Sequence, residues 1–148
     1  MLYLIPGEYK LYPNHFTESG GMVKPVDTTP QTVSLEVEKL LERLNRALCG
    51  PAEQHRDAVV WFCLDISAVH PFADANGRIA VQMLDTLLVR CGYEPLYINQ
   101  YKQRDAAGLY QAVELCRTRR ELQPVYAYLE NSKEYLEPVY SLPISAEG

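Results

Sequence analysis

Apolar residues recur at helical spacing along the central part of this chain, from about residue 34 to residue 131. Gly50-Pro51, Pro71 and Gly92 interrupt the pattern at points where a helix should end, because proline lacks an N–H donor and glycine readily adopts positive φ. The predicted helices span about 34–48, 52–68, 76–90, 104–116 and 121–131. Residues 93–101 are expected to form an extended connector. We therefore predict an all-α, mainly helical bundle.

The first predicted helix has the clearest start signal. Ser34 is a favourable N-cap residue, and Glu36 and Glu38 place negative charge in the first turn, where the helix dipole favours it. In the first three helices the spacing also groups apolar side chains on one face. These are Leu35, Leu40, Leu41, Leu44 and Leu48 in the first, Ala58, Val59, Phe62, Cys63 and Ile66 in the second, and Ile79, Met83, Leu84, Leu87 and Leu88 in the third.

Residues 1–33 differ from the rest of the chain because they contain four prolines and three glycines. Ser19-Gly20-Gly21 is a turn signal between two short runs, His15-Phe16-Thr17 and Met22-Val23-Lys24. We expect a small β-hairpin there, near the N-terminus. With residues 34–131 as a helical core and 132–148 as a tail, the 148 residues suit a single domain.

The composition is that of a soluble globular protein, with 47% apolar and 22% charged residues. A net charge of −5 argues against binding to nucleic acids and to anionic membranes. The apolar runs fall short of the roughly 20 residues of a membrane span, and the N-terminus lacks the basic start of a signal peptide. The four cysteines form no CxxC pair, which favours buried thiols in a reducing cytosol. We expect a cytoplasmic protein, although a secreted effector acting in a host cytosol would share these features.

The segment from His70 to Arg78 gathers residue types that suit phosphate chemistry. His70, at the end of a predicted helix, titrates near neutral pH, and Asp74 offers a hard carboxylate ligand for a divalent metal. Ala75-Asn76-Gly77 forms a turn that opens the next helix, so its backbone N–H groups can bind an anion, and Arg78 adds a guanidinium there. Each part alone also suits an ordinary structural role. Together they predict a site that transfers a phosphorus-containing group.

This segment resembles the signature of Fic domains, HPFx(D/E)GNGRxxR. The resemblance covers roughly residues 6–130, with Pro6-Gly7-Glu8-Tyr9-Lys10 similar to the family's lead-in and residues 15–25 similar to its flap hairpin. It implies a protein adenylyltransferase that uses Mg²⁺ and transfers AMP from ATP to a Ser, Thr or Tyr hydroxyl of a target protein. The flap would align the target by strand addition, and an antitoxin or regulator would be a further partner.

The resemblance also implies roles for individual residues. His70 is implied as the catalytic base and Asp74 as the Mg²⁺ ligand. The implied phosphate-binding residues are Ala75, Asn76, Gly77 and Arg78, and Tyr101 and Tyr110 lie where the family places residues near the nucleotide base.

Two positions depart from the signature. Ala75 stands where the family has glycine, and Val81 stands where it has a second arginine that holds the terminal phosphate of the nucleotide. Loss of that arginine removes a charge-assisted contact of about 1.5–3 kcal/mol. Doc-type toxins, which transfer phosphate, share both features, although they have lysine at the position of Gly77. The alternatives are therefore transfer of phosphate, UMP or phosphocholine, or a degenerate domain that binds a nucleotide or partner without turnover.

Self-inhibited members of the family carry a helix that reads (S/T)xxxE(G/N). The nearest stretch here, residues 34–39, ends in Lys39 and follows the predicted hairpin instead of preceding it. With Val81 in place of the arginine, the inhibitory ion pair could not form. We expect no control by such a helix, so Glu38→Gly should not raise activity strongly.

Overall fold

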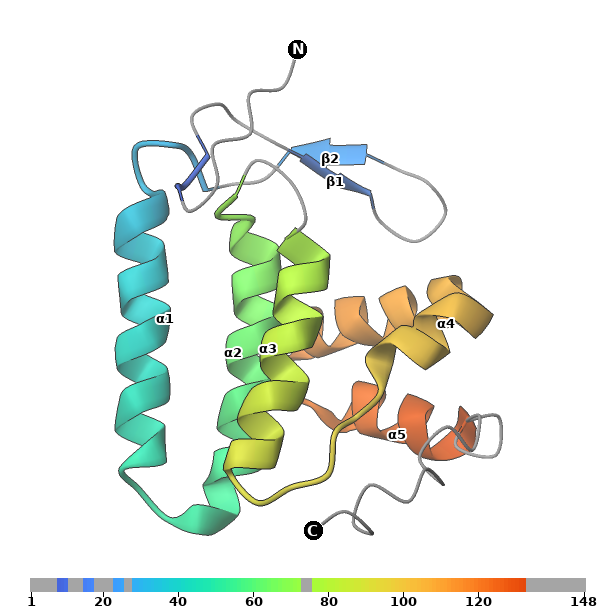
Figure 1. Cartoon of the computed structure of the whole chain (residues 1–148). Helices are drawn as coiled ribbons and strands as arrows, with labels where there is room; N and C mark the ends of the chain where they lie inside the picture. Colours follow the sequence, from blue (N-terminus) through green and yellow to red (C-terminus); the bar gives the residue numbers. More distant parts are fainter. Residues whose placement is uncertain (1–7, 11–14, 18–22, 26–27, 73–75, 133–148) are drawn as a thin grey trace, which may run out of the picture. The chain divides into compact units, whose positions relative to one another are not determined.

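The computed structural model describes residues 8–10, 15–17, 23–25, 28–72 and 76–132. The chain divides after Leu96 into two compact units, Met1–Leu96 and Tyr97–Gly148. Within the described residues, α1 (Val33–Leu48), a short 3₁₀ helix η1 (Ala52–Gln54), α2 (His55–Val69) and α3 (Asn76–Arg90) belong to the first unit, and α4 (Ile98–Arg119) and α5 (Gln123–Ser132) to the second (Figure 1). The predicted helical class is confirmed. That all of these helices form one domain stays a prediction.

In the first unit, α2 packs against both α1 and α3 (Figure 1). The predicted inward face of α2 is largely confirmed, because Val59, Phe62, Cys63 and Ile66 are buried together with Val60. The neighbouring helices contribute the remaining buried apolar side chains, which are Val33, Val37, Leu40 and Leu44 from α1 and Ala80, Leu84 and Leu88 from α3. α2 is thus the central helix of this unit, and the candidate site begins at its C-terminal end.

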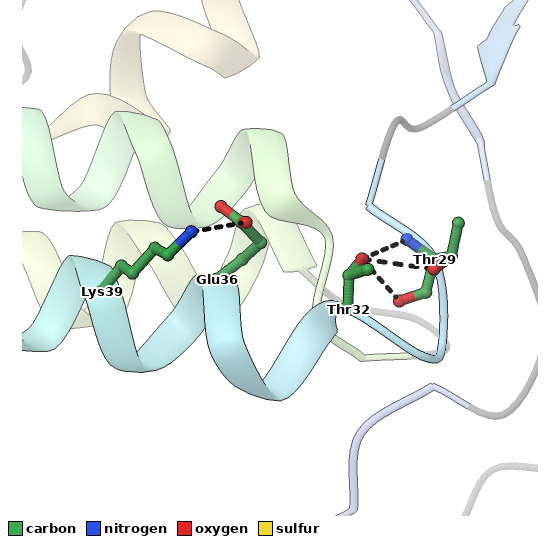
Figure 2. Close-up of polar contacts among 4 residues, drawn as sticks. All are labelled: Thr29, Thr32, Glu36 and Lys39. Atoms are coloured by element: carbon green, nitrogen blue, oxygen red, sulfur yellow. Dashed lines mark hydrogen bonds and ion pairs between the residues drawn. The ribbon is translucent and has the colours of Figure 1, made fainter.

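The start of α1 differs from the prediction that Ser34 caps it. The N-cap is Thr32, and Ser34 lies inside the helix, exposed. A turn from Thr29 to Thr32 precedes the helix. In this turn Thr29 N–H donates to Thr32 Oγ1 at 3.0 Å (Figure 2), and Thr32 N–H donates to Thr29 O at 3.0 Å. The Thr32 hydroxyl therefore faces back into the turn instead of capping the helix. The turn between Thr29 and Thr32 therefore sets where the helix starts, although Ser34 is the better intrinsic N-cap residue.

The inward face of α1 is also narrower than predicted. Its buried positions follow the spacing i, i+4, i+7, i+11 from Val33, which leaves Leu35 and Leu41 with 53% and 43% of their surface exposed. The outer face carries the ion pair between Lys39 Nζ and Glu36 Oε1, 3.5 Å apart (Figure 2). Such an exposed pair contributes little to stability.

The bounds of α3 agree with the sequence prediction, including its C-terminal glycine cap. Gly92 has φ +86°, and its N–H donates to Val89 O at 3.0 Å. The next N–H, that of Tyr93, donates to Leu88 O at 2.9 Å, which completes a Schellman motif. After this cap, Leu96 N–H donates to Asp85 Oδ1 at 3.1 Å and so holds the connector on α3.

In the second unit, α4 packs against α5. The predicted end of the extended connector, at residue 101, is wrong, because α4 begins at Ile98 and not near residue 104. The helix is broken at Asp105, which has φ −152° and ψ 72°, and the Asp105 carboxylate accepts the N–H of Gly108 at 3.0 Å. Asp105 thus caps the second segment of α4, and the start predicted near residue 104 corresponds to this kink.

Two short strands precede the helices. β1 (His15–Thr17) and β2 (Val23–Pro25) pair antiparallel, with Phe16 opposite Lys24 (Figure 1). The turn predicted at residues 19–21 and the tail at 133–148 lie outside the described residues. In the described part of the chain, no helix has the length and apolar character needed to cross a membrane.

Candidate functional site

The candidate site begins where α2 ends. His70 follows the helix with φ 49° and ψ 62°, in the left-handed region, and its N–H donates to Ile66 O at 3.3 Å. Pro71 disfavours a right-handed helical conformation for the preceding residue, so α2 stops at this point. A non-glycine residue in the left-handed region costs roughly 1–2 kcal/mol. Strain of this kind concentrates at functional sites, and it falls here on the histidine that the sequence singled out.

The residues after His70 are held by an N-terminal segment distant in sequence. Pro71 is buried, and its carbonyl accepts the N–H of Lys10 at 2.8 Å. The ring of Phe72 lies against Tyr9, with centroids 6.0 Å apart and planes tilted by 36°. Residues 9–10 therefore fix the backbone that leaves His70.

Asn76 closes the loop from its far end. Its Oδ1 accepts the N–H of Phe72 and its Nδ2 donates to the Phe72 carbonyl, both at 2.9 Å. The residue is 7% exposed. Both polar atoms of this side chain bond to the main chain of Phe72, which leaves the second Nδ2 proton and the backbone of Asn76 for any phosphate contact. Asp74 and Ala75, between these anchors, lie outside the described residues.

The first turn of α3 presents an accessible helix start. Gly77 and Arg78 follow Asn76 in this turn and are exposed. Among the described residues, a Cβ added at Gly77 would meet no atom within 4 Å, so none of them blocks the approach to this backbone. N–H groups in the first turn of a helix have no partner within the helix, and the dipole favours anions there. Val81, one turn further along, is half-buried.

A buried lysine next to this loop was not singled out as a functional residue from the sequence. Lys10 is 3% exposed, and its ammonium donates to the carbonyls of Thr28 and, at 3.4 Å, Val69. Desolvation by burial lowers the pKa of this lysine. In the sequence it is simply part of the lead-in, and a single lysine carries no signal of burial.

Tyr101 and Tyr110, the predicted nucleotide-base residues, belong to the second unit. Tyr101 is buried there, and its hydroxyl donates to Leu129 O at 3.3 Å. Tyr110 lies under the ammonium of Lys102, which is 5.9 Å from the ring centroid. These contacts are internal to the second unit, and a role beside the nucleotide stays a prediction for both tyrosines.

Metal binding by protein side chains alone has no candidate in the described residues, where no group of three or more His, Cys, Asp and Glu could hold an ion. Mg²⁺ in phosphate-handling sites is commonly held by one or two carboxylates together with substrate phosphates. The carboxylate of Asp74 suits that arrangement by its donor chemistry.

Comparison with known proteins identifies the class. Residues 3–88, more than half of the chain, match the model of the Fic/DOC family. The chain belongs to the Fic/DOC family. A search of curated protein sequences gave no match.

The fold has a counterpart among solved structures. A Fic domain containing signaling protein from Bacteroides thetaiotaomicron VPI-5482 is similar with a TM-score of 0.65 and 20% identity, over 87% of this chain and 50% of that one. This likeness shows a shared fold. The chain spans about half the length of that protein.

Proposed function

We propose that this chain is a protein adenylyltransferase, which transfers AMP from Mg-ATP to a Ser, Thr or Tyr hydroxyl of a target protein. One observation carries the proposal: a strained histidine at the end of α2 leads, through a loop closed by Asn76, into the exposed start of α3. This arrangement joins a proton acceptor to an anion-binding helix start, in a chain of the Fic/DOC family.

His70 acts as the general base in this proposal. The hydroxyl oxygen of the target attacks the α-phosphorus of ATP, its proton passes to the His70 imidazole, and the bond from the α-phosphorus to the bridging oxygen breaks. Pyrophosphate leaves and AMP stays on the target. General base catalysis contributes roughly 10²–10⁴-fold in rate, which is large enough for loss of His70 to be decisive.

The nucleotide phosphates are assigned to the start of α3. The backbones of Ala75, Asn76 and Gly77 and the guanidinium of Arg78 would hold phosphate oxygens and so stabilise charge that develops during transfer. Asp74 would hold Mg²⁺, which when bound neutralises phosphate charge. No described residue crowds Gly77, which supports this assignment, because a phosphate needs close access to the backbone there.

The hairpin of β1 and β2 is the proposed flap that aligns the target. It is a two-stranded sheet, and a strand edge can pair with an extended peptide through backbone hydrogen bonds. Recognition through backbone atoms would place the target chain while leaving its side-chain hydroxyl available. An antitoxin or regulator is a further proposed partner.

Val81 favours two alternatives. Without an arginine at this position, the terminal phosphate of ATP loses one contact, as in the Doc-type pattern, and phosphate itself would be the transferred group. UMP and phosphocholine are other groups that the same base could transfer. A non-enzymatic domain that binds a nucleotide or partner is the second alternative.

The test is transfer of label from ATP to proteins of a cell lysate in the presence of Mg²⁺. ATP labelled on the α-phosphate should label a target with the wild-type protein and not with His70→Ala. His55→Ala is the matched control, because His55 lies at the opposite end of the same helix and should be dispensable. Labelling from the γ-phosphate alone would favour phosphate transfer. ATP binding in calorimetry without any labelled product would favour the non-enzymatic domain.

A further inference from the structure

Lys10 is a buried, charged side chain for which the proposed chemistry has no role. It lies in the first unit with its side chain 3% exposed, in the short segment before β1. Burial of an ammonium group is costly unless hydrogen bonds replace its water. The residue must therefore keep its partners, and these partners show where it acts.

Two of the Lys10 contacts lie on either side of His70. The Lys10 N–H donates to Pro71 O at 2.8 Å, and the Lys10 ammonium donates to Val69 O at 3.4 Å. One residue thus holds the carbonyls before and after the histidine. Because His70 is in the left-handed region, its backbone needs such support from its surroundings to stay there.

A third contact reaches the other end of the hairpin segment. The Lys10 ammonium donates to the carbonyl of Thr28, which follows β2, whereas Lys10 itself precedes β1. The chain therefore enters and leaves the hairpin segment at residues that share one ammonium group. The same ammonium joins Thr28, after β2, to Val69, whose carbonyl belongs to the peptide bond with His70.

We propose that Lys10 is a positioning residue that holds the β1–β2 hairpin in register with His70, so that a target hydroxyl presented along the hairpin meets the imidazole. The inference rests on the proposed function and adds to it how target and base are aligned. Lys10 touches neither substrate nor reacting atoms. A misplacement of about 1 Å can cost as much as 10²-fold in rate, so the effect of Lys10 is on the rate of transfer and not on ATP binding.

The first test compares Lys10→Met with Lys10→Arg in the labelling reaction, with α-labelled ATP and lysate protein as acceptor. Lys10→Met keeps the aliphatic stem and removes the ammonium. Its maximal rate should fall roughly 10–100-fold, while the apparent KM for ATP changes less than about twofold. Lys10→Arg, which retains a cationic donor, should recover most of the rate.

Lys39→Met is the matched control. Lys39 is an exposed lysine of α1, and Figure 2 shows its ion pair with Glu36 on the same helix. An unchanged rate in Lys10→Met, or an equal loss through KM, overturns the proposal.

The second test does not depend on catalysis. In NMR spectra of the full chain, Lys10→Met should shift both the His70 imidazole signals and the backbone amide signals of β1 and β2, while the His55 signals stay in place. Lys39→Met should shift none of them. If wild type transfers no label but these shifts occur, the proposed function fails and the positioning role stands. If label is transferred and His70 does not respond to Lys10→Met, the positioning role fails alone.

If Lys10→Met does not fold, a second variant and a measurement on the wild-type protein still test the proposal. Should Lys10→Met not fold, Lys10→Gln keeps a donor on a shorter stem and carries the same expectations. In wild type, the Lys10 Nζ protons should exchange slowly and show contacts to Val69 and Thr28. Rapid exchange without those contacts overturns the geometry. Unfolding of both neutral variants would make Lys10 a residue of stability only, which also overturns the proposal.

Discussion

The carboxamide of Asn76 exchanges two hydrogen bonds with the main chain of Phe72, each 2.9 Å long. Donor and acceptor are both needed, since one bond uses Nδ2 and the other Oδ1. The pair spans residues 73–75 and fixes the point at which α3 begins. The side chain of Asn76 therefore joins the start of α3 to Phe72, and its second Nδ2 proton and its backbone are left for the proposed contact with phosphate.

Asn76→Asp tests this loop closure. The carboxylate keeps an acceptor for Phe72 N–H, loses the donor to Phe72 O, and adds a negative charge beside the proposed phosphate site. We expect the free energy of unfolding to fall by about 1–3 kcal/mol and ATP binding to weaken, as measured by urea denaturation and calorimetry. Asn99→Asp, at an exposed position of α4, is the control that should change neither quantity. Equal behaviour of the two variants would argue against a role for the carboxamide.

Gly77→Ala separates stability from function. Gly77 is helical and a Cβ there would meet no atom of the described residues within 4 Å, so alanine should stabilise α3 by up to about 1 kcal/mol. The same methyl group would occupy the space through which phosphate approaches the backbone, so ATP affinity should fall at least about tenfold. Thermal unfolding and calorimetry measure the two effects. Gly50→Ala, at the end of α1, should leave ATP affinity unchanged, and undiminished ATP affinity in Gly77→Ala would remove the helix start from the proposed site.

Val81→Arg tests the departure from the family signature. An arginine one turn after Arg78 would restore a charge-assisted contact to the terminal phosphate, worth about 1.5–3 kcal/mol. ATP affinity should therefore rise at least about tenfold. Gln82→Arg adds the same charge at the adjacent exposed position and controls for long-range attraction. An equal gain in both variants would show that net charge, and not position 81, governs nucleotide binding.

The buried thiol of Cys63 should make the folded protein less stable in alkaline solution. Burial, with a further contribution from the charge of Asp85, raises the pKa of Cys63 to about 12 from an ordinary value of 9.0. Between these two values the folded chain holds a proton that the unfolded chain releases, so stability is fully present below pH 9 and falls as the pH rises toward 12. The slope from this group is about 1.4 kcal/mol per pH unit.

Urea denaturation from pH 8 to pH 10.5 measures this slope. Burial also raises the pKa values of Cys116 and Tyr128, so wild type alone does not isolate Cys63. Cys63→Ala should show a shallower decline above pH 9 than wild type. Identical slopes would mean that Cys63 does not titrate with unfolding. In native protein, the exposed thiol of Cys49 should react with alkylating reagents well before Cys63.

The ends of helices were predicted best where the backbone conformation favours one particular residue type, glycine or proline. Gly92 marked the end of α3 because its positive φ favours glycine, and Pro71 marked the end of α2. The start of α1 was misplaced because a turn between two threonines competes with the stronger N-cap of Ser34. The start of α4 was misplaced because Asp105 caps a second segment inside the helix, and a capping residue looks the same at a start and at a kink.

For the candidate site, the sequence supplied the types of residue and the structure supplied their relations. The segment from His70 to Arg78 was recognisable because its residues are contiguous. The role of Lys10 was not, since its partners, the carbonyls of Thr28, Val69 and Pro71, are backbone atoms that any residue possesses. Contacts between a side chain and distant carbonyls leave no pattern in a single sequence.

The proposed transfer of AMP requires that His70 faces the α-phosphate of a nucleotide held at the start of α3. A crystal structure of the chain with Mg²⁺ and a non-hydrolysable ATP analogue measures this most directly. We expect the α-phosphate beside the His70 imidazole, phosphate oxygens against the backbone of Gly77 and the guanidinium of Arg78, and the metal on Asp74. A nucleotide bound in the reverse direction, with its γ-phosphate beside His70, or bound away from this helix start, would contradict it.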